Sequence, residues 1–392
     1  MIPTVAPDAA RAHAKLSASG SHKWTVCTPS AHLEEQFPDE GSKYAAEGTF
    51  GHELFERRVS RHLGYALADA PPEEENEHWS QELSEAVQLA VDAAVARIEA
   101  ARSVCPDAMV LLEQRLDYSK WAPAGSGTGD LVIITDDYIE VADLKMGSGV
   151  HIDARGNSQF RLYMLGALNT YGHLYDPKRV IGTVLQPRLN NWGSEDLTVE
   201  ELLQWADEVV VPAAKLAWAG EGPFVPGEHC SSGFCKARYT CAARAQHNLA
   251  VAQADFALVD PLLLTDEQIA TVLDKGDQAI TWLKDVQLYA LKEAERGRVF
   301  DGYKLVAGRS NRKYSNPDAV ATALLAEGIP EAIIYERSLL GITAMEKALG
   351  AKKFTELVGD LVSKPPGKPT LVPVSDKREA INSTASAIAD FP

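Results

Sequence analysis

Basic residues, cysteines and long apolar segments are all scarce in this sequence. The chain has 38 Lys and Arg against 55 Asp and Glu, so its formal net charge is −17. An acidic protein repels nucleic acid at long range, which counts against a protein that simply coats DNA. The same acidic excess is compatible with an enzyme whose carboxylates hold metal ions.

The shortage of apolar runs and cysteines bears on the compartment. No apolar run approaches the roughly 20 residues that a membrane-spanning helix needs. The N-terminal segment also lacks the apolar core of a signal peptide. Five cysteines without an export signal argue against a disulfide scaffold and for reduced thiols or metal ligation. We therefore expect a soluble cytoplasmic protein with no membrane partner.

Apolar residues make up 45% of the chain, enough for a sizeable core, and their periodicity predicts helices and strands. In residues 1–250 we expect helices at 44–62, 81–103, 157–171 and 200–218, with a kink at Pro212, and strands at 108–118, in a hairpin within 129–147, and at 179–186. The order of these elements predicts an α/β fold with a mixed sheet.

Residues 251–392 are expected to form a second, mainly helical region. Thr265 begins a capping-box sequence that predicts a long helix, and Ser315 begins a shorter helix that stops at Gly328. We therefore place the boundary between two domains at residues 250 and 251.

Charged residues stand at the open end of the hairpin. If residues 136–137 form a two-residue loop, Asp130 lies directly opposite Asp143. Facing carboxylates are destabilising unless a cation lies between them. Lys145 is two residues beyond Asp143 and projects to the same face of the sheet. These residues predict a Mg²⁺ site with an adjacent charge stabiliser; the alternative is a solvated sheet face with scattered charges.

Further polar residues stand at regular places around the hairpin. Gln159 and Tyr163 are four residues apart, and so lie on one face of the predicted helix. His52 lies on the first helix, and Glu113 on the strand before the hairpin. Each has a simpler interpretation: a hydrogen-bonded helix histidine, ordinary helix-surface residues, and a charge on the sheet face.

Together these motifs resemble the PD-(D/E)XK nucleases of the RecB type, over about residues 17–245. The resemblance rests on Gly129-Asp130, Asp143-Leu144-Lys145, the Gln159 and Tyr163 pair, and the histidine of the motif at 47–52. It implies a restriction-endonuclease-like core with helical additions. It also implies that Mg²⁺ or Mn²⁺ is held by His52, Asp130, Asp143 and the Leu144 carbonyl. Lys145 would then stabilise phosphoryl charge, Gln159 and Tyr163 would position the strand or brace the site, and Glu113 would be a supporting carboxylate.

Cys230, Cys235 and Cys241 lie within twelve residues, and Cys27 lies about 200 residues upstream. Four soft thiolates suit an iron–sulfur cluster or tetrahedral zinc. One early cysteine and a late trio resemble the iron–sulfur nucleases of the AddB type and the four-cysteine CRISPR-associated nucleases, which implies a structural [4Fe–4S] cluster. The wider spacing within this trio leaves Zn²⁺ open, with His229 as a substitute ligand, and some of the four are alternatively plain buried thiols. Cys105 falls outside the pattern.

The C-terminal part contains a basic turn. A strand is expected at 303–306, and Arg309, Arg312 and Lys313 follow it closely. Such a turn suits contact with a DNA backbone, the alternative being a solvated turn. This segment, the extended segment 364–370 and the nuclease motifs resemble a phage and prophage family catalogued as a domain of unknown function. That resemblance implies a place near replication and recombination genes, in the cytoplasm of a bacterial host.

These observations together predict a metal-dependent, exonuclease-like deoxyribonuclease acting in phage DNA replication or recombination. Its expected partners are linear double- or single-stranded DNA and a phage recombination or single-strand-binding protein. A non-catalytic DNA-binding or scaffold component is the alternative from another class, and an RNA nuclease is a third.

Overall fold

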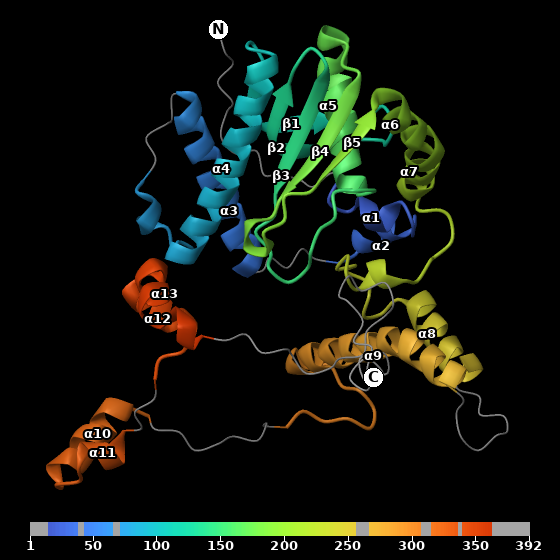
Figure 1. The fold of residues 1–392 in the computed structure, drawn as a ribbon. Coiled ribbons are helices and arrows are strands. Elements are labelled where there is room, and N and C mark those ends of the chain that lie inside the picture. The colour runs from blue at the N-terminus through green and yellow to red at the C-terminus, as the bar shows by residue number, and fades with distance from the viewer. Residues whose placement is uncertain are drawn as a thin grey trace, which may run out of the picture. The chain divides into compact units, whose positions relative to one another are not determined.

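A mixed β-sheet forms the centre of the first part of the chain (Figure 1). The computed structural model describes residues 15–37, 43–65, 71–255, 266–306, 315–335 and 339–362. By its contacts the chain divides into two compact units, Met1–Arg296 and Gly297–Pro392, and the sheet belongs to the first.

The sheet has five strands in the order β1-β2-β3-β4-β5. Its strands are β1 (Met109–Asp117), β2 (Ser126–Ile134), β3 (Tyr138–Leu144), β4 (Arg179–Leu185) and β5 (Ser194–Thr198). Neighbouring strands are antiparallel except β3 and β4, which are parallel and joined by helix α5 (Ser158–Tyr175). The predicted mixed α/β fold is therefore confirmed. Strand β5, a short and largely polar segment, was not predicted.

The predicted register of the hairpin is also confirmed. Leu131 pairs with Ala142 and Ile133 with Glu140, the register that a loop at residues 136–137 requires. The Thr135 hydroxyl accepts hydrogen bonds from the backbone N–H groups that follow it in this turn. One step beyond the paired residues, the same register brings Asp130 and Asp143 opposite each other.

Two helical layers cover the sheet. The helices of the first unit are α1 (Ser21–Trp24), α2 (Ser30–Glu34), α3 (Lys43–Leu63), α4 (Gln81–Val104), α5, α6 (Val199–Trp205), α7 (Val211–Ala219), α8 (Ala242–Asp255) and α9 (Asp266–Glu295). Helices α3 and α4 pack with Leu131 and Ile133 on one face, and α5, α6 and α7 pack with Val132 and Ile134 on the other (Figure 1). The central strands are therefore buried on both faces, and their alternate residues pack into two separate cores.

The predicted helix at 200–218 is interrupted in the structure. Helices α6 and α7 are joined by a π-helical turn at Ala206–Val210. Pro212 stands in the first turn of α7, where its missing N–H is tolerated. The disruption thus lies next to the expected proline kink.

A buried ion pair links α4 to the sheet. The Arg97 guanidinium lies 2.6 Å from Glu140 Oε1, which also accepts a 2.6 Å hydrogen bond from the Thr183 hydroxyl. Glu140 is only 4% exposed, whereas Arg97 reaches the surface.

Removing the arginine should therefore destabilise the fold. We expect Arg97→Ala to lower the free energy of unfolding by about 3 kcal/mol, because Glu140 would stay buried without its cation. Urea denaturation of the variant measures this loss. Glu140→Gln with Arg97→Ala should recover part of it, since the double variant buries no unpaired charge; if it recovers none, the effect is not electrostatic.

Helix α9 belongs to the first unit, so the contact-based boundary lies after residue 296 rather than at 250. The two positions differ because α9 packs against α8 and against the segment of the cysteine trio. The rings of Tyr239 and Tyr289 stack with centroids 6.0 Å apart, and Asp285 pairs with Arg244 at 2.7 Å. The described part of α9 begins at Asp266, in agreement with the predicted capping sequence that begins at Thr265.

In the described residues of the second unit, the regular secondary structure is helical. Its helices are α10 (Pro317–Ala326), α11 (Glu331–Ile334), α12 (Ile342–Leu349) and α13 (Ala351–Val358). The strand predicted at 303–306 is wrong, because these residues are described and form no strand. Gly297 and Gly302, which both precede this segment, have positive φ and turn the chain at short intervals. In the described parts of the whole chain, no helix combines the length and apolar character needed to cross a membrane.

Candidate metal-dependent active site

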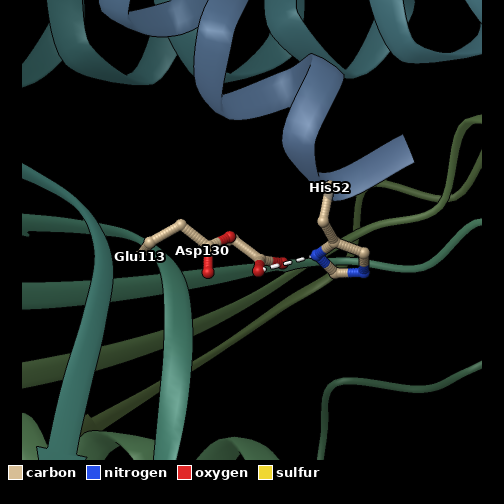
Figure 2. Close-up of side chains that lie close together, drawn as sticks. All are labelled: His52, Glu113 and Asp130. Atoms are coloured by element: carbon tan, nitrogen blue, oxygen red, sulfur yellow. Dashed lines mark hydrogen bonds and ion pairs between the residues drawn. The ribbon is translucent and has the colours of Figure 1, made fainter. Parts of the chain in front are cut away.

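Three side chains from two layers of the fold meet at the end of the hairpin. Asp130 lies on β2, Glu113 on the neighbouring strand β1, and His52 on helix α3 (Figure 2). One ligand atom from each side chain lies within 4.8 Å of the other two, a spacing that suits one metal ion. Among the described residues, His52, Glu113 and Asp130 are the group of candidate ligands whose atoms lie this close together.

Asp130 is held from two sides. His52 Nδ1 lies 2.8 Å from Asp130 Oδ1, and the Leu144 backbone N–H donates a hydrogen bond of 2.5 Å to Oδ2. The side chain is 4% exposed. Through Oδ2 the side chain therefore accepts a backbone hydrogen bond between β2 and β3, and its other oxygen, Oδ1, is held beside the histidine.

Glu113 occupies an unusual backbone position. Its φ of +47° lies in the left-handed region, which a side chain of this size rarely adopts. The pairing of β1 with β2 is regular on both sides, at Leu112–Leu131 and Gln114–Gly129. The strain is thus confined to the residue opposite Asp130, the pattern expected where a side chain is turned towards a functional site.

Asp143 and Lys145 lie beside this trio. Lys145 Nζ is 2.8 Å from Asp143 Oδ2, but this buried oxygen has no partner in hydrogen-bond geometry among the described atoms. Burial raises the pKa of Asp143, and the nearby Asp130 charge raises it further, although Lys145 and His52 oppose this. A buried carboxylate, beside two more carboxylates and an imidazole, fits a hard divalent cation.

The site tunes His52 strongly. Burial lowers the pKa of His52, but the charges of Asp130, Asp143 and Glu113 outweigh burial and raise it to about 9. Because the pKa is higher in the folded protein, the charged imidazolium stabilises the metal-free fold. This contribution is complete below the unfolded pKa of about 6.5. That contribution is lost as the pH rises through about 9.

Metal binding should therefore release a proton. At a pH of about 7.5 we expect Mn²⁺ binding to displace close to one proton from His52, because a metal ligand must be the neutral imidazole. Calorimetry in two buffers of different ionisation enthalpy measures the release. His52→Gln should bind with almost no proton release, and equal release from both proteins would contradict the assignment.

Gln159 and Tyr163 contact each other rather than standing free. Gln159 Nε2 donates a 3.0 Å hydrogen bond to the Tyr163 hydroxyl. Tyr163 is 6% exposed and packs over Gly127, where an added Cβ would lie 2.5 Å from its ring. Burial and the Asp143 charge raise the Tyr163 pKa, so the hydroxyl stays neutral. Of the two predicted roles, bracing the site suits Tyr163 better than contact with substrate.

Gln186 and Arg188 were not identified from the sequence. Gln186 follows β4 and binds the loop after Lys145 through Gly147, Val150 and Ile152. Gln186 is fully buried. In the sequence, the signal that could have identified it is a polar residue directly after an apolar strand.

Arg188 joins the same loop to the helices. Its guanidinium donates to the Met146 carbonyl at 2.9 Å and pairs with Glu47 of α3 and Glu82 of α4, both at 2.7 Å. Arg188 therefore ties the strand of Asp143 to the helix of His52.

The four predicted cysteines line one pocket. Cys27 follows α1, and Cys230, Cys235 and Cys241 lie between α7 and α8, with His229 alongside. All are free thiols, and no three of these described sulfur atoms lie within 4.8 Å of one another. Burial, and then the Glu34 charge, raises the pKa of Cys235 to about 12. Cys105 stands apart, at the end of α4.

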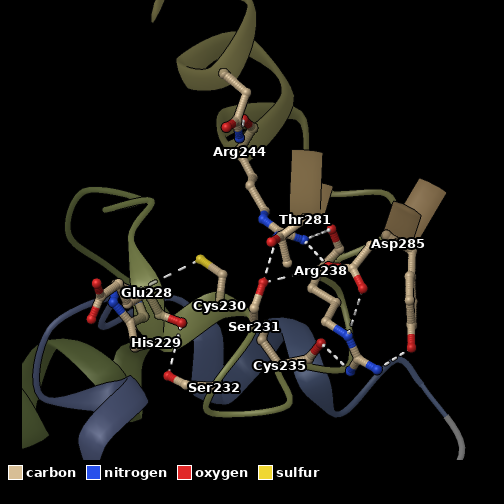
Figure 3. A network of polar contacts seen from close by, with 12 residues as sticks. Glu228, His229, Cys230, Ser231, Ser232, Cys235, Arg238, Arg244, Thr281 and Asp285 are labelled. Carbon is tan, nitrogen blue, oxygen red and sulfur yellow. Dashed lines mark hydrogen bonds and ion pairs between the residues drawn. The ribbon is translucent and has the colours of Figure 1, made fainter. Parts of the chain in front are cut away.

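A polar network joins the cysteine segment to α9 (Figure 3). Arg244 is 4% exposed and donates to Asp285 at 2.7 Å and to the Ser231 hydroxyl at 2.5 Å. Arg238 lies 3.7 Å from the other oxygen of Asp285. On the other side, the Ser21 hydroxyl of α1 lies 2.6 Å from that of Ser158, which begins the helix of Gln159. The cysteine pocket is thus connected both to α9 and to the helix beside the candidate active site.

Arg309, Arg312 and Lys313, predicted to contact DNA, lie outside the described residues.

Comparison with known proteins gives a family and distant likenesses among solved structures. A model of the family described as "Protein of unknown function (DUF2800)" matches residues 13–379. Among solved structures, the chain is similar to the protein titled "Crystal structure of SSO0001", at 11% identity, with 49% of this chain and 96% of that chain covered and a TM-score of 0.24. A TM-score this low supports no argument about the present chain.

Proposed function

The chain belongs to the DUF2800 family of proteins of unknown function, and we propose, from the geometry of its site, that it is a metal-dependent nuclease that hydrolyses DNA. The observation that carries the proposal is the convergence of His52, Glu113 and Asp130 beside the buried pair of Asp143 and Lys145. A purely structural role gives no reason to bury several carboxylates around one point. With its mixed sheet and hairpin, the site supports a core of the PD-(D/E)XK type.

Each residue has a distinct task in this proposal. His52, Glu113 and Asp130 would hold Mg²⁺ or Mn²⁺, with Asp143 and the Leu144 carbonyl as further ligands. When bound, such an ion polarises the scissile phosphate and lowers the pKa of a water molecule. Lys145 is already positioned by Asp143 and would donate to a phosphoryl oxygen as its charge grows. The Gln159 and Tyr163 pair would keep α5 and β2 at a fixed separation.

The cysteine pocket would hold a structural [4Fe–4S] cluster. The four thiols line one pocket, and four soft thiolates suit such a cluster, with Zn²⁺ and His229 as the alternative. Such a cluster would join α1, and through it α5, to the segment before α8.

The substrate and setting follow from the resemblance rather than from the fold. We propose linear DNA as substrate, exonuclease-like action, and a place in phage or prophage recombination in the bacterial cytoplasm. A recombination or single-strand-binding protein would be the partner.

The proposal can be tested by measuring Mg²⁺-dependent hydrolysis of linear double-stranded DNA, single-stranded DNA and RNA. We expect wild-type protein to degrade DNA and Lys145→Met to lose at least about 100-fold in rate, while Mn²⁺ binding persists. Lys178→Met, which changes an exposed lysine on the surface, is the matched control and should keep full activity. Wild-type protein that binds DNA without cutting it would favour the scaffold alternative, and cleavage of RNA alone would identify an RNA nuclease.

A further inference from the structure

One face of α9 carries an exposed apolar stripe. Ile269, Leu273, Ile280 and Leu283 are each between 43% and 52% exposed. Their separations of four, seven and three residues become the alternating four and three of a coiled coil when Gly276 is counted between them. Continued beyond Leu283, the same spacing selects Gln287, Ala290 and Ala294.

We propose that this stripe is a self-association surface, on which α9 pairs antiparallel with α9 of a second copy of the chain. We call the line of residues at this four–three spacing the seam; its positions alternate between two types. In an antiparallel pair, each position of one type lies against a position of the other type in the partner helix. Centred between residues 281 and 282, the pair would place Ile280 against Leu283 of the partner subunit. Gly276 would then face Gln287 of the partner subunit, and Leu273 would face Ala290 of the partner subunit. Apart from the central layer, each large residue meets a small one, so the seam fills without voids.

Charges beside the seam favour the same arrangement. Asp277 and Lys284 are exposed, stand next to the stripe, and form no ion pair with another residue that the structure describes. Asp277 also borders a hollow that Arg244 and His247 of α8 line from the other side. The antiparallel pair brings Asp277 beside Lys284 of the partner subunit, and does so twice by symmetry. A parallel pair would instead set Asp277 beside Val272 of the partner subunit and leave Gly276 facing Gly276 of the partner subunit across a gap.

A second copy explains this pattern better than a different protein does. When the helix is reversed about nearly the same point, large residues fall opposite small ones and Asp277 falls opposite Lys284. That self-complementarity is what an isologous two-fold contact requires, and a heterologous partner places no such demand on one helix. The opposite face of α9 is already occupied, through Tyr289 and Asp285, by the segment around α8.

Sedimentation equilibrium of the purified full-length protein tests the proposal. We expect a dimer, and we expect Leu283→Lys to abolish it. Leu288→Lys is the matched control, because Leu288 is 47% exposed against 50% for Leu283 on the same helix but lies off the seam. Asp277→Lys should raise the dissociation constant about tenfold or more, since it creates two pairs of like charges. Asp277→Lys with Lys284→Asp should restore it to near the wild-type value.

Three results would overturn the proposal. The first is a wild-type protein that stays monomeric at every concentration reached. The second is a dimer that survives Leu283→Lys, or that Leu288→Lys disrupts equally, with circular dichroism showing that both variants keep their helix. The third is a charge-exchanged double variant as weak as the single one, which would exclude the antiparallel register. None of these readouts depends on nuclease activity.

Discussion

Asp143→Asn should abolish metal-dependent hydrolysis of DNA and, at the same time, make the metal-free protein more stable. The loss of rate should be at least about 100-fold, because the substitution removes a carboxylate from the proposed metal site and the anchor of Lys145. The gain in stability has a separate cause. Burial holds the pKa of Asp143 above its usual range, so ionising this group opposes folding.

The sign of the stability effect is set by that elevated pKa. The unfolded aspartate is ionised above about pH 4, and the folded one resists ionisation until higher pH. The unfavourable contribution is therefore absent in acid and fully developed once the pH exceeds the folded pKa. An amide carries no charge, so the melting temperature of metal-free Asp143→Asn should exceed that of wild type by a few degrees near neutral pH.

Thermal melts with and without Mn²⁺, beside a DNA-hydrolysis assay, measure both effects. Asp137→Asn makes the same chemical change at an exposed position of the same hairpin, and should alter neither quantity noticeably. Wild-type hydrolysis by Asp143→Asn would remove this residue from the site. A lower melting temperature for the metal-free variant would show that the Lys145 ion pair outweighs the cost of burial.

Cys235→Ser should release the proposed metal group and lower the melting temperature by about 10 °C or more. A metal group bound only by the folded chain adds its binding energy to the stability of the fold. The loop that it closes, from Cys27 to the trio, contains about 200 residues, so its loss also frees the unfolded chain. Because Cys235 has a pKa of about 12 without metal, binding must displace a proton, and occupancy should fall in acid.

Absorbance spectra and melting curves of anaerobically purified protein measure this result. We expect broad visible absorbance in the wild type, lost in Cys235→Ser, and unchanged in Cys105→Ser, the matched control outside the pocket. A colourless wild type containing stoichiometric zinc would replace the cluster with the alternative metal. If Cys105→Ser and Cys235→Ser behave alike, no metal group depends on the pocket.

The hairpin was predictable because two simple rules determine it. Side chains alternate along a strand, and a two-residue loop at residues 136–137 leaves one register that keeps Leu131 and Ile133 in the core. Asp130 and Asp143 then follow by counting. Strand β5 has no such signal, since a short edge strand with several polar residues resembles a loop.

The candidate ligand set was harder to predict than the hairpin. The sequence places Glu113 on a strand, but only the backbone geometry shows that it turns towards His52 and Asp130. Gln186 and Arg188 act through contacts with backbone groups and with distant helices, which no local spacing encodes. Residues that position a site from another element are therefore visible only after folding.

The left-handed backbone at Glu113 has a consequence for how this sheet is constrained. A chain optimised for stability alone would carry glycine here, or asparagine, because either adopts positive φ with less strain. Glutamate instead gives up some stability and places a carboxylate within reach of the imidazole. The central sheet is thus a compromise, with one residue of an otherwise regular strand held in a conformation that only the chemistry of its side chain justifies.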